Sequence, residues 1–366
     1  MKIAVPKEIK TMEGRVAITP QGLKTLVDCG HTVYIEKNAG IISGIQDDEY
    51  IATGAIILDS AAAVWDAGEM IYKVKEPLEQ EFGFLKEGQI LFTFLHLAAN
   101  KTLTDMILQK KIIGIAYETV QASDGSLPLL APMSAVAGRL AIQMGCACLE
   151  VKNGGKGILL SGVPGVAPAN VTIVGGGISG LNAAHLASGM GARVTIIDIN
   201  FTRLCYIEDI FHSRVVTLIS NSGNIEESCI NADLVIGSVL IPGARAPKLI
   251  KRDVLRKMKK GSAFVDLAVD QGGCAETSRP TTHLDPIYIE EGIVHYCVAN
   301  MPGAVPRTST YALANATLPY AVAIANKGYQ KAIADDPALA RGVNVHRGSL
   351  TCPRVAEAFG MACAEI

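Results

Sequence analysis

The sequence predicts an α/β fold made of two Rossmann-like, doubly wound domains, and three observations support it. Strand-like and helix-like stretches alternate over most of the chain, which is typical of mostly parallel sheets covered by helices. The length of 366 residues exceeds that of an ordinary single domain. A glycine-rich turn lies between two strand-like runs over residues 171–198, and it predicts the first βαβ unit of one domain.

The first domain is expected over residues 1–128. Apolar runs and helical stretches alternate there, and this alternation predicts a mostly parallel sheet. Its strands are expected at residues 2–6, 31–36, 70–75, 89–96 and 112–119, and its helices at 20–29, 47–52, 60–66 and 103–109.

The second domain is expected over residues 129–306. A helix over residues 133–149 is expected to cross between the domains. After residue 198 the sheet is expected to continue with strands at 214–220, 232–240, 262–269 and 292–300, and with helices near 201–211, 225–231 and 252–258. The uncharged stretch Gly157–Ala184 contains prolines and many glycines that break a membrane-spanning helix, so two buried strands are expected there.

The last residues, 307–366, follow a link rich in proline and threonine. They are helix-like and show no strand pattern of their own, so their most economical place is against the first domain. That domain is therefore expected to be discontinuous, with the second domain inserted into it.

The glycine-rich turn predicts a nucleotide site. Gly175 permits a tight turn, Gly177 allows a pyrophosphate to approach the backbone, and Gly180 lets the following helix pack closely on the sheet. The amides at the start of that helix then face the phosphates. A glycine-rich structural turn is the alternative, but the flanking strand-like runs favour the nucleotide.

A carboxylate at the end of the second strand indicates which nucleotide binds. Asp198 is placed to accept hydrogen bonds from the ribose hydroxyls of adenosine, and it would repel a 2′-phosphate. This favours NAD over NADP. Arg203 follows closely, and we interpret it as a neighbour of the adenosine or its phosphates.

Composition excludes several classes of protein. The 33 basic and 35 acidic residues nearly cancel, so there is no basic surface to attract nucleic acid. The amino terminus has no signal-peptide pattern, which predicts a cytoplasmic protein with reduced thiols and no membrane segment. Cys146 and Cys148 lack partners at zinc-ligand spacing, and no metal is expected.

Four polar residues follow strand-like runs and are candidates for chemistry, because ligands of open α/β sheets bind beyond the carboxyl ends of the strands. Lys75, His96 and Asp270 each end such a run, and Arg15 lies in a loop soon after the first strand. They suit oxidation of a small amino or hydroxy acid. Arg15 and Lys75 would bind a carboxylate, His96 would move a proton, and Asp270 would orient ammonia or water or stabilise a cationic iminium.

Structural roles remain open for some of these residues. His96 is also consistent with a satisfied structural histidine, and Asp270 precedes two glycines and is consistent with organising a turn. Ser134, near the start of the crossing helix, either caps that helix or donates to a phosphate.

Several stretches taken together resemble the bacterial alanine dehydrogenases. The similar segments run nearly end to end and include VPKEIKTMEGRVAITP, YKVKEP, QILFTFLHLA, VDLAVDQGGCAETSRPTTH and NMPGAVPRTSTYALANATLPY. The resemblance implies reversible oxidative deamination of L-alanine to pyruvate and ammonium, with NAD as the cofactor. It also implies a homo-oligomer, a hexamer.

The resemblance assigns residue roles as well. It makes Arg15 and Lys75 the substrate-binding pair, and His96 and Asp270 the catalytic pair. The positions that it matches to cofactor contacts are Ser134, Asp198, Arg203, Ser220, Val239, Leu240, Leu267, Ala268, Val269, Asp270, Arg279, Val298, Ala299, Asn300 and Met301. The glycine-rich turn itself adds Gly175, Gly177, Ile178, Ser179 and Gly180 to the expected cofactor site.

The chain departs from the family's pattern in a few places. Phe94 stands where a tyrosine is common, so any hydrogen bond from that hydroxyl is absent. Ala323 and Lys327 stand where some members carry residues associated with magnesium, which again predicts no metal. Ile178 and Ser179 replace two common valines, with little expected effect on backbone binding of phosphate.

Two other functions are consistent with parts of the sequence. The soluble NAD-binding component of a proton-translocating transhydrogenase shares motifs, but its task does not require the four candidate residues. A redox-sensing regulator would need a partner-binding tail or a basic surface, and neither is present in the sequence.

Overall fold

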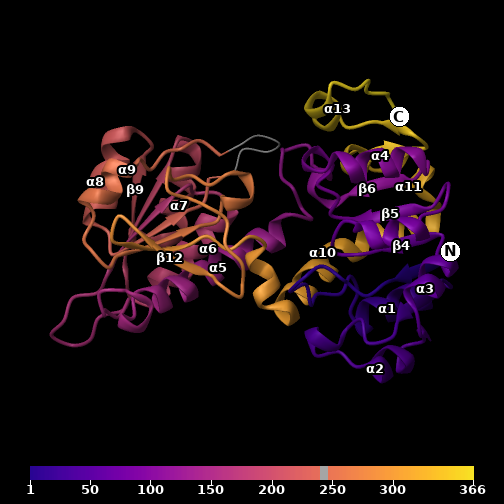
Figure 1. Ribbon diagram of the computed structural model, residues 1–366, viewed down its shortest axis with the longest axis horizontal. Coiled ribbons are helices and arrows are strands. Elements are labelled where there is room, and N and C mark those ends of the chain that lie inside the picture. The colour runs from indigo at the N-terminus through magenta and orange to yellow at the C-terminus, as the bar shows by residue number, and fades with distance from the viewer. Residues whose placement is uncertain (240–245) are drawn as a thin grey trace. The chain divides into compact units, whose positions relative to one another are not determined.

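The computed structural model describes residues 1–239 and 246–366 (Figure 1). The chain forms two compact units: Met1–Met133 with Val305–Ile366, and Ser134–Ala304. The domain limits expected from the sequence lie after residues 128 and 306. The assignment of a function to each of these domains remains a prediction. Within the described ranges no helix is long and apolar enough to cross a membrane.

The first unit contains a mixed sheet of eight strands. Its order is β15-β14-β6-β5-β4-β1-β2-β3. The strands are β1 (Lys2–Val5), β2 (Thr32–Glu36), β3 (Ile56–Leu58), β4 (Met70–Tyr72), β5 (Ile90–Thr93), β6 (Ile113–Ala116), β14 (Val343–His346) and β15 (Ser349–Leu350). The segment from β3 to β6 is parallel throughout, and the chain reverses its direction of travel across the sheet between β1 and β4. In open α/β sheets a ligand crevice forms at such a point.

Helices connect and cover this sheet. They are α1 (Pro20–Asp28), α2 (Asp47–Ala52), α3 (Ala61–Ala67), α4 (Lys101–Gln109), α10 (Pro306–Lys327), α11 (Tyr329–Asp335), α12 (Pro337–Gly342) and α13 (Pro353–Phe359). Local sequence sets several helix starts: the Thr19 hydroxyl accepts from Gly22 N ahead of α1, and Pro20 occupies its first turn. In Figure 1, α13 lies beside α4, where the Lys101 ammonium sits over the Phe359 ring.

The expectation that residues 307–366 lack strands is wrong. Strand β14 pairs antiparallel with β6, and β15 pairs antiparallel with β14. Both strands are too short to show alternation in the sequence. Pairing covers the edge of β6, which would otherwise leave backbone groups without partners. The C-terminal residues do belong to the first unit, in agreement with the predicted discontinuous arrangement.

The second unit contains a sheet of seven strands with order β12-β13-β11-β10-β7-β8-β9. The strands are β7 (Asn170–Val174), β8 (Arg193–Asp198), β9 (Val215–Ile219), β10 (Leu234–Gly237), β11 (Ala263–Asp266), β12 (Ile287–Glu290) and β13 (Ile293–Tyr296). Only β12 among the described strands of this sheet runs antiparallel. The helices are α5 (Ala131–Cys148), which begins in the first unit, α6 (Ile178–Gly189), α7 (Phe201–Phe211), α8 (Ser222–Asn231) and α9 (Arg252–Lys257).

The expectation of two buried strands within Gly157–Ala184 is also wrong. The stretch contains one strand, β7, and the first half of α6. Residues ahead of β7 form a loop closed by mutual backbone hydrogen bonds between Val163 and Val166. Leu159 and Val166 in this loop are exposed, so hydrophobic composition alone did not indicate burial.

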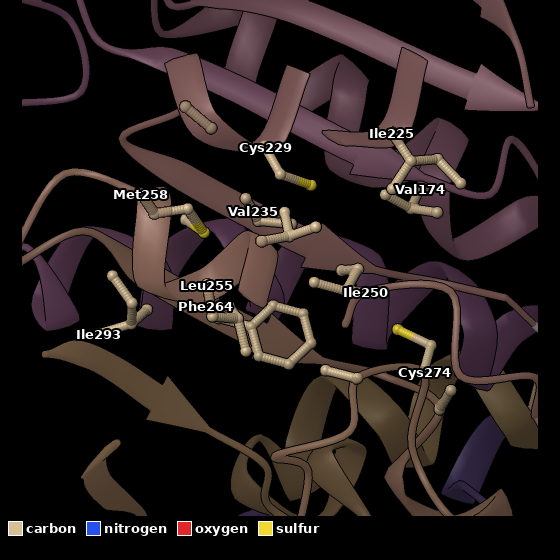
Figure 2. Close-up of a cluster of buried hydrophobic side chains, with 14 of the residues drawn as sticks. Val174, Ile225, Cys229, Val235, Ile250, Leu255, Met258, Phe264, Cys274 and Ile293 are labelled. Carbon is tan, nitrogen blue, oxygen red and sulfur yellow. The ribbon is translucent and has the colours of Figure 1, made fainter. Parts of the chain in front are cut away.

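A buried core holds α8 and α9 against one face of the second sheet (Figure 2). Sheet residues, helix residues and the loops after β10 and β11 all contribute to it. The labelled members are Val174, Ile225, Cys229, Val235, Ile250, Leu255, Met258, Phe264, Cys274 and Ile293. Because their packing fixes the strands in register, it also fixes where the residues after each strand lie.

Glycines allow α6 to pack closely against the β7–α6 turn and against α5. A Cβ added at Gly180 would lie 1.9 Å from the carbonyl oxygen of Gly175. A Cβ at Gly138, in α5, would lie 2.0 Å from the carbonyl oxygen of Ser179. Both positions therefore require glycine for packing.

Gly180→Ala is expected to lower the stability of the second unit by about 1–3 kcal/mol, since the methyl group collides with backbone that cannot move away freely. Gly189→Ala is the matched control in the same helix. A Cβ at Gly189 would meet no neighbouring atom within 4 Å in the described part of the chain, so alanine is expected to raise stability by up to about 1 kcal/mol. Urea unfolding of both variants measures this, and equal midpoints would contradict it.

Candidate functional site

The turn between β7 and α6 has the geometry expected of a phosphate-binding loop. Gly175 has a φ of +106°, and its N–H donates to Ile197 O at 2.8 Å. Gly177 is the N-cap of α6. A Cβ at Gly177 would meet no described atom within 4 Å apart from its own neighbours, so packing within the chain does not require glycine there. A ligand that approaches the backbone would explain it.

The Asp198 carboxylate lies beside this turn and is held by two backbone donors. Gly176 N donates to Oδ2 at 2.6 Å, and Asn200 N donates to Oδ1 at 2.8 Å. These bonds fix the carboxylate while leaving lone pairs to accept further hydrogen bonds. Arg203 is tied to the same turn, because its Nε donates to Gly176 O at 2.5 Å.

The other predicted cofactor positions mostly follow parallel strands of the second sheet. Ser220 follows β9, Val239 comes two residues after β10, the segment 267–270 follows β11, and 298–301 comes soon after β13. All of them therefore lie toward the same edge of the sheet as the glycine turn. Leu240 lies outside the described residues.

Two further predicted cofactor positions lie away from strand ends. Ser134 is the fourth residue of α5 and not the residue before it, so the capping alternative is wrong. Arg279 is exposed, and its guanidinium stacks on the Tyr288 ring at 3.9 Å.

Asp270 is exposed in a short 3₁₀ turn over Val269–Gln271. Asn300 N lies 3.5 Å from its Oδ2. The alternative that Asp270 only organises the turn is not supported, because Asp266 does so. The buried Asp266 carboxylate accepts from Ala268 N and Cys274 N, both at 2.9 Å. Asp270 therefore stays available for a ligand.

The remaining candidates belong to the first unit, and Arg15 is the most constrained of them. Its side chain is 2% exposed and forms a two-pronged ion pair with Glu13, through Nε at 2.6 Å and Nη2 at 2.5 Å. Nη1 contacts the Met133 sulfur at 3.1 Å. Such a two-pronged pair fixes the plane and the orientation of the guanidinium.

Lys75 follows β4, the neighbour of β1, and is largely buried. Burial lowers the pKa of its ammonium, and the nearby charge of Arg15 lowers it further, while Glu76 opposes both effects. Glu76 itself accepts from Lys10 at 2.5 Å. Because burial makes this ammonium costly to leave unpaired, it favours an anionic partner.

His96 follows β5, which is next to β4. It has a φ of +48°, an unusual left-handed conformation for a residue other than glycine. Glu118, which follows β6, holds this turn by accepting from His96 N at 2.6 Å and Leu95 N at 3.2 Å. The ring is 44% exposed, stacks parallel to Phe94, and has Nδ1 3.9 Å from the Glu118 carboxylate.

Lys75 and His96 thus lie beyond the carboxyl ends of the adjacent strands β4 and β5, and Arg15, in the loop after β1, is close enough to Lys75 to lower its pKa. Together they can bind a carboxylate and exchange a proton with an adjacent oxygen or nitrogen. Three carboxylates were not predicted from the sequence: Glu13 and Glu118, which hold these residues, and the turn-forming Asp266. For Glu13 the spacing of two residues before Arg15 was an available signal, whereas Glu118 comes from a different strand.

Models of known families match nearly the whole chain. The "Alanine dehydrogenase/PNT, N-terminal domain" model matches residues 4–137, and the "Alanine dehydrogenase/PNT, C-terminal domain" model matches residues 141–353.

Curated relatives match over their full length. An alanine dehydrogenase of Methanococcus maripaludis, an archaeon, is 59% identical over 362 residues, covering 99% of this chain and 97% of the relative. One of Halomonas elongata is 56% identical over 365 residues, covering 100% of this chain and 98% of the relative. Because one of these relatives is archaeal, the similarity is not restricted to bacterial members.

Solved structures agree. An L-alanine dehydrogenase superposes with a TM-score of 0.95 at 52% identity, covering 98% of this chain and 99% of that one. A transhydrogenase from Sinorhizobium meliloti superposes with a TM-score of 0.82 at 22% identity, over 96% of this chain and 99% of that one, and it shares the fold. With both family models matched and more than half of all residues identical to full-length relatives, the chain belongs to the alanine dehydrogenase family.

Proposed function

We propose that this protein is an NAD-dependent L-alanine dehydrogenase. The reaction is L-alanine + NAD⁺ + H₂O ⇌ pyruvate + NH₄⁺ + NADH + H⁺. The observation that carries the proposal is the row of Arg15, Lys75 and His96 after adjacent strands β1, β4 and β5, in a chain whose full-length relatives are alanine dehydrogenases. A 2-oxo acid needs a pair of cations for its carboxylate and a proton donor for its carbonyl oxygen, and these residues supply both.

The roles of the first unit's residues follow from their chemistry. Arg15 and Lys75 bind the carboxylate of alanine or pyruvate. His96 gives a proton to the carbonyl oxygen of pyruvate when ammonia adds to it. In the direction of alanine oxidation, His96 removes a proton from the water that attacks the imine. The partial exposure of its ring is compatible with contact to a substrate.

The second unit supplies the nucleotide site and Asp270. The glycine turn and the start of α6 would hold the pyrophosphate, and Asp198 would accept from the ribose hydroxyls, which favours NAD over NADP. NAD, when bound, accepts the hydride from the substrate carbon. Asp270 stabilises the positive charge of the iminium and orients the attacking ammonia or water.

Residues 129–306 accordingly form the NAD-binding domain of this proposal, and residues 1–128 with 307–366 form the substrate domain. We further propose a cytoplasmic protein that binds small molecules and no metal. Its assembly as a hexamer rests on the resemblance to the family. The rival function, a transhydrogenase component, is less well supported, because the similarity to that structure at 22% identity extends to the fold alone.

The test of the function follows NADH absorbance with pyruvate and ammonium, with glyoxylate and 2-oxobutyrate as parallel substrates. We expect turnover with pyruvate, and weaker turnover with 2-oxobutyrate, since one extra methylene changes transition-state binding by only ~1–3 kcal/mol. Absence of turnover with every oxo acid, in protein that binds NADH, would contradict the enzyme and favour the binding component.

Gly177→Ala tests the nucleotide site separately from the fold. The added methyl enters space that the described chain leaves open, so the unfolding midpoint should stay within error of the wild type. NADH should bind roughly tenfold more weakly or worse, because pressing a methyl into a close contact costs ~1–3 kcal/mol. NADH fluorescence titration measures this, with Gly189→Ala as control; unchanged affinity would remove Gly177 from the site.

His96→Ala and Asp270→Asn test the catalytic pair. Loss of a general acid–base group typically lowers the rate by ~10²–10⁴-fold, and we expect kcat to fall by that amount in His96→Ala and substantially in Asp270→Asn. NADH affinity should be retained in His96→Ala. Steady-state kinetics with saturating ammonium measures the effect, and a kcat near that of the wild type in both variants would exclude these roles.

A further inference from the structure

The backbone that carries Lys75 is bonded at every N–H and C=O from Lys73 to Lys75. Lys73 N donates to Phe92 O, and Lys73 O accepts from the Tyr117 hydroxyl at 2.8 Å. Val74 O accepts from Phe94 N, and Lys75 O accepts from the Thr93 hydroxyl at 2.9 Å. The two remaining groups, Val74 N and Lys75 N, are outside the strand ladder, and one side chain serves both.

That side chain is Glu8, which comes from the loop after β1. Its Oε1 accepts from Val74 N at 2.7 Å and from Lys75 N at 3.2 Å. Its Oε2 lies 3.3 Å from the Lys73 ammonium, which also donates to Glu81 at 2.7 Å. Glu81 in turn accepts from Leu78 N at 2.9 Å. The two carboxylates therefore hold both ends of the segment that bears Lys75.

This cluster is deeply buried, and packing alone would be a simpler way to stabilise the fold. Glu8 is 7%, Lys73 1% and Glu81 3% exposed. Burial raises the pKa of Glu8, while the charge of Lys73 opposes that shift. Buried charges are costly to desolvate, and replacing them with apolar side chains is often neutral or stabilising. A role in placing Lys75 exactly therefore explains this buried cluster better than a contribution to the stability of the fold does.

We propose that Glu8 is the positioning residue for Lys75: it fixes the backbone from which the substrate-binding ammonium projects. The inference rests on the proposed function, in which Lys75 binds the substrate carboxylate. Glu8 needs two oxygen acceptors for this task, one for the two backbone N–H groups and one for Lys73. A glutamine has a single oxygen, and the ammonium of Lys73 draws that oxygen more strongly than the neutral backbone does. The amide NH2 of the glutamine then faces the N–H groups of Val74 and Lys75, which cannot bond to it.

Glu8→Gln is therefore expected to raise the KM for pyruvate by ~10- to 100-fold, the range expected when a hydrogen bond between charged partners is lost. It should change kcat less, and it should leave the Kd for NADH unchanged, because the predicted nucleotide residues belong to the second unit. The unfolding midpoint should change little, since the substitution removes the excess buried negative charge. A purely structural Glu8 would lower the midpoint and leave KM alone.

Glu69→Gln is the matched control. Glu69 also joins β1 to the β4 region by accepting from a backbone N–H, that of Lys2 at 2.6 Å. It does so just before β4 begins, at the opposite end of that strand from Lys75. We expect its KM for pyruvate to equal that of the wild type.

Lys75→Ala separates a failure of the proposed function from a failure of the positioning role of Glu8. If wild-type protein does not turn over pyruvate, or if Lys75→Ala leaves KM unchanged, the proposed function or the role of Lys75 fails. If Lys75→Ala raises KM and Glu8→Gln does not, the positioning role of Glu8 is overturned. Should Glu8→Gln not fold, Thr93→Val decides: it removes the hydroxyl bonded to Lys75 O, and a KM equal to that of the wild type would overturn the placement argument.

Discussion

The constraint on which the structure depends is the parallel pairing of strands around a reversal in strand order. In each sheet the chain fills one side, returns to the middle and fills the other side, between β1 and β4 in the first unit and between β7 and β10 in the second. Parallel strands all end at one edge, so residues separated by dozens of positions meet there without any sequence motif. The hydrophobic cores keep the strands in register, and they thereby keep those residues in place.

Carboxylates then fix the functional residues at this end of the sheet more precisely than strand order does. Glu13 holds Arg15, Glu8 holds the backbone of Lys75, and Glu118 holds the turn of His96. Glu13 forms an ion pair with the guanidinium itself, whereas Glu8 and Glu118 bind backbone N–H groups next to the functional side chains. Their negative charges also partly offset the positive charges gathered in this part of the sheet. In the second unit Asp266 does the equivalent work for the turn that presents Asp270.

Much of this arrangement could be predicted from the residues. The helix over Phe201–Phe211 has the predicted bounds, and most of the predicted strands contain an observed strand, because long apolar runs and capping residues act locally. The strands β3, β12, β14 and β15 escaped prediction because polar residues, glycine or proline flank them closely. Strands of the same length, such as β4 and β5, lie inside longer apolar runs that made them visible in the sequence. The exposed loop before β7 was mistaken for strand because its apolar composition resembles that of a buried segment.

The sequence by itself determined the α/β class, the nucleotide-type turn and the candidates Arg15, Lys75, His96 and Asp270. The reason is that glycine spacing and the residues that follow a strand depend only on short stretches of the chain. Only the tertiary structure decided what holds those side chains. Glu8 reaches Lys75 across 67 positions of sequence, and Glu118 reaches His96 across 22. Such contacts depend on which strands become neighbours in the sheet, and strand order is a property of the whole fold.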